Sequence, residues 1–336
     1  VSQFDLGTAY YMGNGIGEDK LEGARWWLKA AEQGVAEAQF NLATVLYKGD
    51  VVEKDIPRAA EWFRKAAEQR NSRAQGVLGM MYYAGLGVER DYAEAEKWLR
   101  KAALQGDAES QYDLALIYYN GDGFRQDYAE ARLWLAAAAG QGLGEAQVLM
   151  GNMWEYGLGG EANMGEAVNC YERAALGGNA EGQYCMGALH HSGRGVEQDF
   201  AKALEWHRAA AAQDNYRSME ALGYMYENGE GVEQNDIESF YWRRRAAVEG
   251  DYAESQYALA MMYEEGKGCR KNLTQALELY EKAAVHNLPE SLYTLGISYY
   301  NGDELIGGIA DYSEARSWME RCVDVIRDPK KGIDPG

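Results

Sequence analysis

Residues 74–103 read AQGVLGMMYYAGLGVERDYAEAEKWLRKAA, and this stretch decides the fold. Its apolar positions recur every four residues, with Leu78 and Tyr82 on one face of a first helix. Gly85 is expected to end that helix, because glycine accepts the left-handed backbone of a C-cap. Asp91 is then expected to cap a second helix that carries a tryptophan and an alanine pair. One unit of the fold is therefore predicted to be two helices joined by a short glycine-rich loop.

The same unit recurs nine times along the 336 residues. An apolar residue followed by Gly or Ala, here called the repeat leucine, returns every 36 residues with a single step of 37, at Leu6, Leu42, Leu78, Leu114, Met150, Met186, Leu222, Leu259 and Leu295. Seven residues after each repeat leucine there is a glycine, at Gly13, Gly49, Gly85, Gly121, Gly157, Gly193, Gly229, Gly266 and Gly302. A fixed period of this length is typical of helical repeat proteins, in which each unit buries its apolar face against its neighbours.

The sequence predicts an all-α fold, a right-handed α-solenoid of nine antiparallel helix pairs. The predicted units are residues 1–34, 35–70, 71–106, 107–142, 143–178, 179–214, 215–250, 251–287 and 288–325. Two prolines and two glycines near the carboxyl end lead us to expect a disordered tail over residues 326–336. Because the chain begins at Val1, inside a repeat, we also expect that a segment precedes it.

Composition narrows the function classes. The formal net charge is −20, which disfavours binding to nucleic acid or to an anionic membrane surface and favours a basic protein partner. No apolar run approaches the length needed to cross a bilayer, so membrane insertion is not expected. The four cysteines occupy no fixed repeat position, which leaves the compartment open, and Cys170 with Cys185 is left open as a disulfide or two free thiols.

No motif for catalysis, a cofactor or a metal emerges. The loop glycines lack the lysine and the preceding strand of a phosphate-binding loop. His190 and His191 are adjacent and so point to different sides of a helix, unlike the i, i+4 spacing of metal ligands. Asn272 matches a glycosylation sequon but also fits a helix cap, which is the favoured interpretation. The arginines at 243–245 are interpreted as a solvated helix face, with an anion contact as the alternative.

These repeat columns resemble the Sel-one-like repeat (SLR) family, relatives of the tetratricopeptide repeats. The resemblance covers about residues 1–325 and rests on the pattern Ala-x-x-x-Leu-Gly-x-x-Tyr-x-x-Gly-x-Gly…Asp…Ala-x-x-Trp…Ala-Ala. It implies a non-catalytic scaffold that binds another protein. Bacterial members include immunity proteins that neutralise effectors of type VI secretion, which implies a periplasmic or cytoplasmic protein here. The alternatives are an adaptor in a signalling or protein-quality-control complex and, less favoured, a hydrolase.

In the tetratricopeptide relatives the first helices line the concave face, so the resemblance implies a groove there. Five residues after the repeat leucine, tyrosine in repeats one to four gives way to glutamate or histidine in repeats five to eight. We interpret this change as an aromatic half and an acidic half of one protein-binding groove, or else as solvated glutamates in an acidic chain. The predicted binding residues are Tyr11, Tyr47, Tyr83, Tyr112, Tyr119, Glu155, Tyr184, His191, Glu220, Tyr224, Glu227, Tyr257, Glu264, Glu265 and Tyr300. The oligomeric state is left open.

Overall fold

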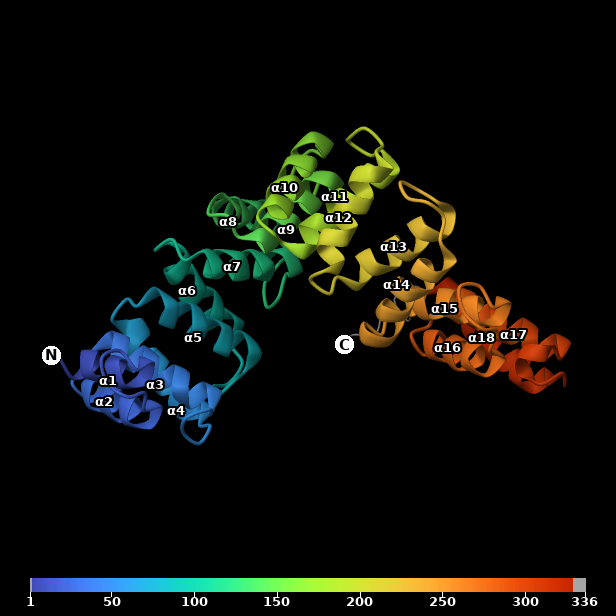
Figure 1. Ribbon diagram of the computed structural model, residues 1–336. Coiled ribbons are helices and arrows are strands. Elements are labelled where there is room, and N and C mark those ends of the chain that lie inside the picture. Colours follow the sequence, from blue (N-terminus) through green and yellow to red (C-terminus); the bar gives the residue numbers. More distant parts are fainter. Residues whose placement is uncertain (1, 329–336) are drawn as a thin grey trace. The chain divides into compact units, whose positions relative to one another are not determined.

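The computed structural model describes residues 2–328, and regular structure within them is entirely helical (Figure 1). Eighteen α-helices and one short 3₁₀ helix follow one another in this part of the chain, without a strand. They form nine consecutive helix pairs, which confirms the predicted all-α solenoid of helix-pair repeats.

Each repeat contributes a first helix with an odd number and a second helix with an even one. The first helices are α1 (Gln3–Met12), α3 (Ala36–Lys48), α5 (Ser72–Ala84), α7 (Ala108–Asn120), α9 (Gly144–Tyr156), α11 (Ala180–Ser192), α13 (Tyr216–Asn228), α15 (Ala253–Glu265) and α17 (Pro289–Asn301). The second helices are α2 (Lys20–Glu32), α4 (Ile56–Glu68), α6 (Tyr92–Ala103), α8 (Tyr128–Gly140), α10 (Met164–Leu176), α12 (Phe200–Ala211), α14 (Asp236–Glu249), α16 (Leu273–Val285) and α18 (Tyr312–Arg327). The 3₁₀ helix η1 (Glu304–Ile306) lies in the longer loop of the ninth repeat.

The chain divides into two compact units, Val1–Ala174 and Ala175–Gly336. Within each unit a first helix packs against the second helix of its own repeat, and that second helix packs against the first helix of the next repeat. Most contact surfaces are therefore formed by helices adjacent in sequence, as expected for a repeat protein whose core is built by stacking, and smaller contacts join α5 to α7 and α11 to α13.

The helix ends use the residues that the sequence pattern singled out. All nine repeat glycines adopt a left-handed backbone, with φ between 65° and 80°, directly after a first helix. At the start of the second helices the Asp91 and Asp127 carboxylates each accept from two backbone N–H groups, and the Asn272 amide oxygen caps α16 by accepting from one. The reciprocal half of a capping box is recorded among the described residues at Ser2 and Asp5 only. Glu94 and Glu130, three residues after Asp91 and Asp127, contribute only their backbone N–H groups to these caps.

The core of each unit is made of alanines and leucines at the repeat positions. Ala95, Leu99 and Leu114 are fully buried. The small residue after the repeat leucine is required for the close approach of the two helices. A Cβ added at Gly79 would lie 2.7 Å from the Leu99 side chain. The same crowding occurs at Gly7, where Trp27 occupies the space.

A ladder of glutamine side chains runs through the repeats. Gln75 of α5 is buried and donates to the backbone oxygen of Ala67 at 2.9 Å, which satisfies a carbonyl at the end of α4. Gln105 then donates to the Gln75 side chain at 2.6 Å. The same pairing, 30 residues apart, is made by Gln33 with Gln3, Gln69 with Gln39, Gln141 with Gln111 and Gln213 with Gln183. Each glutamine pair lies within one repeat, whereas the bond from Gln75 to the Ala67 carbonyl joins one repeat to the one before it.

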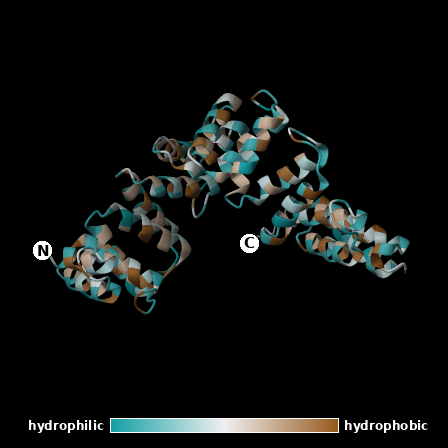
Figure 2. Ribbon diagram, viewed as in Figure 1, coloured by the Kyte–Doolittle hydropathy of each residue, from teal (hydrophilic) through white to brown (hydrophobic). Residues whose placement is uncertain are grey.

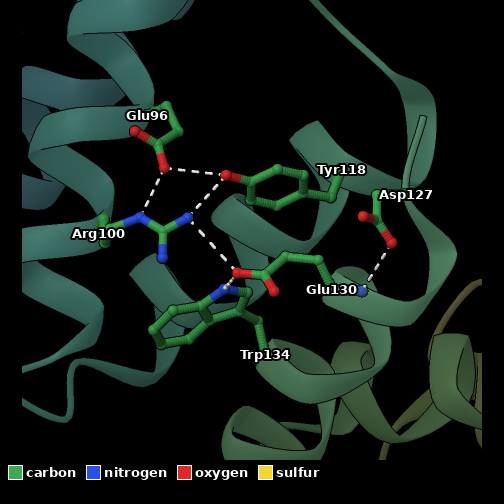
Figure 3. A network of polar contacts seen from close by, with 6 residues as sticks. All are labelled: Glu96, Arg100, Tyr118, Asp127, Glu130 and Trp134. Carbon is green, nitrogen blue, oxygen red and sulfur yellow. Dashed lines mark hydrogen bonds and ion pairs between the residues drawn. The ribbon is translucent and has the colours of Figure 1, made fainter. Parts of the chain in front are cut away.

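A second polar network joins consecutive repeats in the first unit (Figure 3). The Arg100 guanidinium of α6 forms an ion pair with Glu96 at 2.6 Å and donates to the Tyr118 hydroxyl of α7 at 2.7 Å. Tyr118 in turn donates to Glu96 at 2.9 Å. The Glu130 carboxylate of α8 lies 3.4 Å from Arg100 and accepts from the Trp134 indole at 3.0 Å. Figure 3 shows these side chains converging from three helices, which makes this network a clamp between repeats three and four.

No helix within residues 2–328 is both long enough and apolar enough to cross a membrane. Figure 2 shows hydrophilic and hydrophobic residues interspersed along the helices.

Two expectations about the chain are corrected by the structure or fall outside it. α18 continues to Arg327, so the first residues of the predicted tail are helical, and residues 329–336 of that tail lie outside the described residues. None of the four cysteines forms a disulfide, so the bridge left open between Cys170 and Cys185 is absent.

Candidate functional site

The column five residues after the repeat leucine packs against a residue sixteen positions further on, in the second helix of the same repeat. In repeats one to four this partner is apolar. Tyr11 stacks on Trp27 at 4.6 Å between ring centroids, and Tyr47 packs with Phe63 in one apolar cluster. The tyrosines of the first repeats are therefore partly interior residues, and only a part of each ring is available to a partner.

From the fifth repeat the sixteen-residue partner becomes polar, and the first-helix residue changes with it. Glu155 accepts from the Tyr171 hydroxyl at 2.9 Å, and Glu264 accepts from the Tyr280 hydroxyl at 2.8 Å. Tyr280 is buried, and its pKa is raised by that burial and by the bond to Glu264. The change from tyrosine to glutamate thus has a packing cause that the column alone does not reveal.

In the seventh repeat the polar partner is Arg243, whose side chain is only 7% exposed. Its guanidinium pairs with Glu220 at 3.2 Å and with Glu227 at 2.7 Å. Lys267 also binds Glu227, at 2.5 Å. Burial opposes ionisation of Glu227, but its bond to Lys267 and the charge of Arg243 outweigh burial and lower its pKa. The interpretation of residue 243 as part of a solvated arginine face is wrong, because it is the centre of a buried ion network.

The pKa of Glu220, in the same network, is shifted in the opposite direction to that of Glu227. Its carboxylate accepts from the Ser255 hydroxyl at 2.5 Å as well as from Arg243. Burial nevertheless raises the pKa of Glu220, because the compensation by Arg243 and Ser255 is incomplete. Glu155, Glu220, Glu227 and Glu264 are therefore bonded within the protein and do not form a row of open carboxylates.

An open pocket lies on the first-helix side of the first unit, and we call it the aromatic pocket. It has a volume of about 500 Å³ and is formed by α3, α4, α5 and α7. The lining residues are Phe40, Thr44, Tyr47, Phe63, Arg73, Gly76, Val77, Met80, Met81, Ala84, Leu86, Asp107, Glu109, Ser110 and Asp113. Met80 is 36% exposed and Leu86 is 39% exposed, so large apolar side chains face the solvent here.

Gly76 lines the aromatic pocket and occupies a column that is mostly aromatic. Two residues before the repeat leucine, the other repeats carry Phe4, Phe40, Tyr112, Val148, Tyr184, Glu220, Tyr257 and Tyr293. A Cβ at Gly76 would overlap with the Ser110 hydroxyl of α7, so no larger side chain fits in this arrangement. Glycine at this position therefore allows α7 to approach α5 closely beside the pocket.

The rim of the aromatic pocket is unevenly charged. On the α5 side, the Arg73 guanidinium lies 4.6 Å from the centroid of the Phe40 ring, a cation–π contact. On the α7 side are Asp107, Glu109 and Asp113. Burial, together with the charges of Glu109 and Asp107, raises the pKa of Asp113 to about 6. No ion pair with Glu109 or Asp113 is recorded among the described residues, so this side of the rim carries uncompensated negative charge.

A pocket in the second unit occupies the same repeat positions, and we call it the histidine pocket. It has a volume of about 320 Å³ and is lined by Tyr184, Ala188, His191, His207, Arg217, Glu220, Ala221, Tyr224 and Tyr252. Arg217 lies 4.1 Å from the Tyr184 ring centroid, as Arg73 does over Phe40, and also pairs with Glu181 at 2.6 Å. Four of the predicted binding residues, Tyr184, His191, Glu220 and Tyr224, are brought together here.

The remaining predicted residues have individual surroundings. The Tyr83 hydroxyl donates to Asp122 at 2.7 Å, which raises its pKa to about 12. Tyr119 packs edge-on against Tyr128, and Tyr300 packs in the same way against Tyr312. Tyr112 is half-buried in an apolar cluster, and Tyr257 packs beside Tyr280. Glu265 is exposed.

A third pocket lies on the second-helix side of repeats one and two. Elsewhere an arginine of one second helix bonds to a tyrosine eighteen residues later, as Arg208 does to Tyr226 at 2.7 Å. Leu28 and Leu46 replace such a pair here, and a hollow of about 560 Å³ remains beside them. Its rim mixes basic and acidic residues, and no side chain in it is aimed at a common point that would define a ligand.

The contact that comes nearest to a catalytic pair is between His207 and Ser218. The His207 Nδ1 atom lies 3.2 Å from the Ser218 hydroxyl oxygen. Ser218 is fully buried and His207 is 2% exposed, and burial lowers the pKa of His207 to about 4. A nucleophile must reach a substrate, so this pair is better explained as a satisfied polar contact in the core. Within residues 2–328 no group of three or more metal-binding side chains occurs either.

Two classes of residue were missed by the sequence reasoning. The first is the column that holds Phe63, Leu99, Tyr171 and Arg243, one residue after the repeat tryptophan. The sequence does contain a signal for this column. The column is apolar in every repeat whose paired first-helix position is tyrosine, and it is polar in every repeat where that position is Glu or His. The second is the acidic rim with Asp113, which becomes visible only when α5 and α7 are placed side by side.

Comparison with known proteins agrees with the repeat pattern. The family model of the Sel1 repeat matches nine segments, at residues 1–35, 36–71, 72–107, 108–143, 144–179, 180–215, 217–251, 253–284 and 289–321. No curated protein matches the chain significantly. Sel1 repeats mediate protein binding, and the family consists generally of interaction scaffolds without catalytic activity.

Solved structures give the same assignment. A Sel1 repeat protein from Oxalobacter formigenes is 30% identical, with a TM-score of 0.71 over 86% of this chain and 84% of that one. The protective antigen c5321 of uropathogenic Escherichia coli, described as displaying an SLR fold, is 29% identical, with a TM-score of 0.59 over 99% of this chain and 80% of that one. The immunity protein PA5088 from Pseudomonas aeruginosa is 17% identical, with a TM-score of 0.47 over 66% of this chain and 82% of that one, and this likeness carries no functional argument. With nine matched repeats over nearly its whole length, the chain belongs to the Sel1 repeat family.

Proposed function

We propose that this chain is a non-catalytic scaffold that captures a partner protein on its first-helix side, and that the partner presents a basic surface. The observation that carries the proposal is the recurrence of one pocket at equivalent repeat positions in both units. Phe40 and Tyr184 are 144 residues apart, which is four repeats of 36 residues, and so are Arg73 and Arg217. A feature that the helix-pair fold required would appear in every repeat, whereas arginine occupies this position only at Arg73 and Arg217.

The chemistry of both pockets suits a protein ligand better than a small polar one. Each contains aromatic and aliphatic side chains that are partly exposed, including Met80 and Tyr224, with charged groups at the rim. Aromatic side chains and arginine are enriched among residues that contribute most to protein–protein binding. The formal charge of −20 adds long-range attraction for a basic partner.

The test is a pull-down from a lysate of the source organism at low and at high salt. Charge reversal of Glu155, Glu227 and Glu264 is unsuitable, because these residues bond to Tyr171, Arg243 and Tyr280 within the protein. The variant carrying Met80→Ala and Tyr224→Ala removes exposed side chains from the two pockets. We expect it to lose a stoichiometric basic partner that the wild-type protein retains.

The matched control carries Leu133→Ala and Ile237→Ala, which removes two exposed apolar side chains from second helices. Retention of the partner by this control localises binding to the first-helix side. If the control loses the partner and the pocket variant keeps it, binding lies on the second-helix side and the proposal is wrong. Failure of the wild-type protein to retain any partner at either salt concentration also contradicts the proposal.

A narrower form of the proposal is an immunity protein that neutralises a basic secreted effector. The strong negative charge and the presence of two anchor pockets are compatible with a clamp of this kind. The captured partner would then be a toxic enzyme, and one equivalent of this chain would abolish its activity. A partner that stays active and recruits a third protein would instead identify an adaptor.

A further inference from the structure

The aromatic pocket has a chemistry that defines its occupant more narrowly than the proposed function does. Its walls are formed by aromatic and thioether side chains, and Gly76 contributes no side chain to it. A volume of about 500 Å³ lies in the range of ligand pockets, which is ample for one large side chain and its flanking backbone. Met80 and Met81 are unbranched and adapt to different apolar shapes.

The two sides of the rim set the orientation of that occupant. Arg73 on α5 is held over the Phe40 ring and closes one side with a positive charge. Arg73 is the only cation among the pocket residues, whereas the α7 side carries three acidic side chains, Asp107, Glu109 and Asp113. Asp107 already accepts from the Ser110 backbone N–H at 2.8 Å, which leaves Glu109 and Asp113 to face a ligand. A cation placed between them would offset the burial and the neighbouring negative charges that make ionisation of Asp113 unfavourable.

We propose that the aromatic pocket binds a segment of the partner that carries one large apolar side chain and, within a few residues of it, a lysine or arginine. The apolar side chain contacts Phe40, Tyr47 and Met80, and the basic group contacts Glu109 and Asp113. This inference rests on the proposed function and specifies one of its contacts.

The histidine pocket does not share this preference. Its positions equivalent to Gly76 and Ser110 are Glu220 and Ser255, and the Glu220 carboxylate bonds to Ser255 and Arg243 within the protein. The volume of this pocket is smaller, about 320 Å³. A segment of apolar and basic residues is therefore expected to bind the first unit and not the second.

The experiment observes the methionine methyl groups by NMR in the whole protein labelled with ¹³C at those groups. The probes are ten-residue Gly/Ser peptides that contain one leucine and one lysine, separated by zero to four residues. Control peptides replace the lysine with glutamate or the leucine with serine. Resonances are assigned with Met80→Leu, Met81→Leu and Met261→Leu variants. Met261 is the matched control because it lies at the same repeat position as Met80, two residues after a repeat leucine, and is 40% exposed.

We expect the leucine–lysine peptide of the preferred spacing to shift the Met80 and Met81 resonances and to leave Met261 unchanged. Replacement of lysine by glutamate in the peptide, or Asp113→Asn with Glu109→Gln in the protein, should weaken binding about five- to tenfold. Met80→Ala should weaken it by a similar factor, and Met261→Ala should leave it unchanged. Because Met80 and Glu109 are exposed, these variants retain the fold, which circular dichroism verifies.

Three results would overturn the inference. Equal shifts at Met261 would show that binding is not specific to the aromatic pocket. Equal affinity for the glutamate peptide would remove the role of Glu109 and Asp113. Absence of any shift at Met80 up to millimolar peptide would exclude the pocket as a peptide site. If the pull-down still retains a partner through the first-helix side, the proposed function survives each of these results, so the two failures are distinguishable.

Discussion

Glu264 accepts a hydrogen bond from the hydroxyl of Tyr280, sixteen residues later, at 2.8 Å. Glu155 has the same relationship to Tyr171, at 2.9 Å, and Glu227 has it to Arg243, at 2.7 Å. In the first unit the equivalent positions hold Tyr47 and Phe63, which are packed together without a polar bond. This contact between the two helices of a repeat therefore exists in two forms. In one form a tyrosine of the first helix packs on an apolar residue of the second helix. In the other a glutamate of the first helix accepts from a hydrogen-bond donor of the second.

The matched pairs predict that Glu264 and Tyr280 are energetically coupled. Glu264→Ala should lower the free energy of unfolding by about 1–3 kcal/mol, because it leaves the buried Tyr280 hydroxyl without an acceptor. The double variant Glu264→Tyr, Tyr280→Phe installs the pair found at Tyr47 and Phe63 and should recover most of that loss. Urea unfolding of the single and double variants measures the coupling. Strictly additive losses would contradict the pairing.

The network around Arg243 predicts a larger effect for Glu227. Glu227→Lys places a third positive charge beside Arg243 and Lys267, which both bind this carboxylate. Breaking a buried ion pair by removing one partner costs roughly 3–5 kcal/mol, so the second unit should be severely destabilised. Chemical denaturation measures the change, and Glu278→Lys on an exposed position of α16 is the control, expected within about 0.5 kcal/mol of wild type. Unchanged stability in Glu227→Lys would mean that the network contributes little.

The polar clamp in Figure 3 predicts a smaller loss for Tyr118→Phe. The Tyr118 hydroxyl accepts from Arg100 and donates to Glu96, and the substitution removes both bonds while keeping the ring. Arg100 keeps its ion pair with Glu96, so the expected loss is about 1 kcal/mol. Differential scanning calorimetry gives the shift in melting temperature. Tyr156→Phe, at a hydroxyl on an exposed side chain, should produce no shift.

The repeat register, the helix boundaries and the caps could be predicted from the sequence because each depends on local residue chemistry. Gly85 and Asp91 act through their own backbone and side chain, so their roles follow from the residue type. The internal partners of the glutamates were not predicted, because these partners lie sixteen positions away in a column that was not compared with theirs. The acidic rim at Asp113 was not predictable in this way, since its environment depends on how closely α5 approaches α7 at Gly76.

His207 predicts a dependence of stability on pH in the second unit. Burial lowers its pKa from 6.5 to about 4, so between these values the unfolded chain binds a proton that the folded chain does not. Stability from this group is fully present above pH 6.5 and is lost as the pH falls through 4, by about 3 kcal/mol in total. His207→Leu should flatten this part of the pH profile of unfolding measured by tyrosine and tryptophan fluorescence. A profile with an unchanged slope between pH 4 and 6.5 would assign the dependence to other groups.

Asp113 predicts the opposite slope in the first unit, together with a conflict between stability and binding. Its pKa is raised from 3.8 to about 6, chiefly by burial, so the ionised form disfavours folding. The stability associated with this carboxyl is greatest below pH 3.8 and is lost as the pH rises through 6. Asp113→Asn should therefore raise the free energy of unfolding at pH 7.5 by about 1–2 kcal/mol, after allowance for its partial exposure. The same substitution should weaken binding of the leucine–lysine peptide. A residue whose replacement stabilises the fold and impairs binding is retained for its ligand, whereas reduced stability in Asp113→Asn would show that the carboxylate serves the fold.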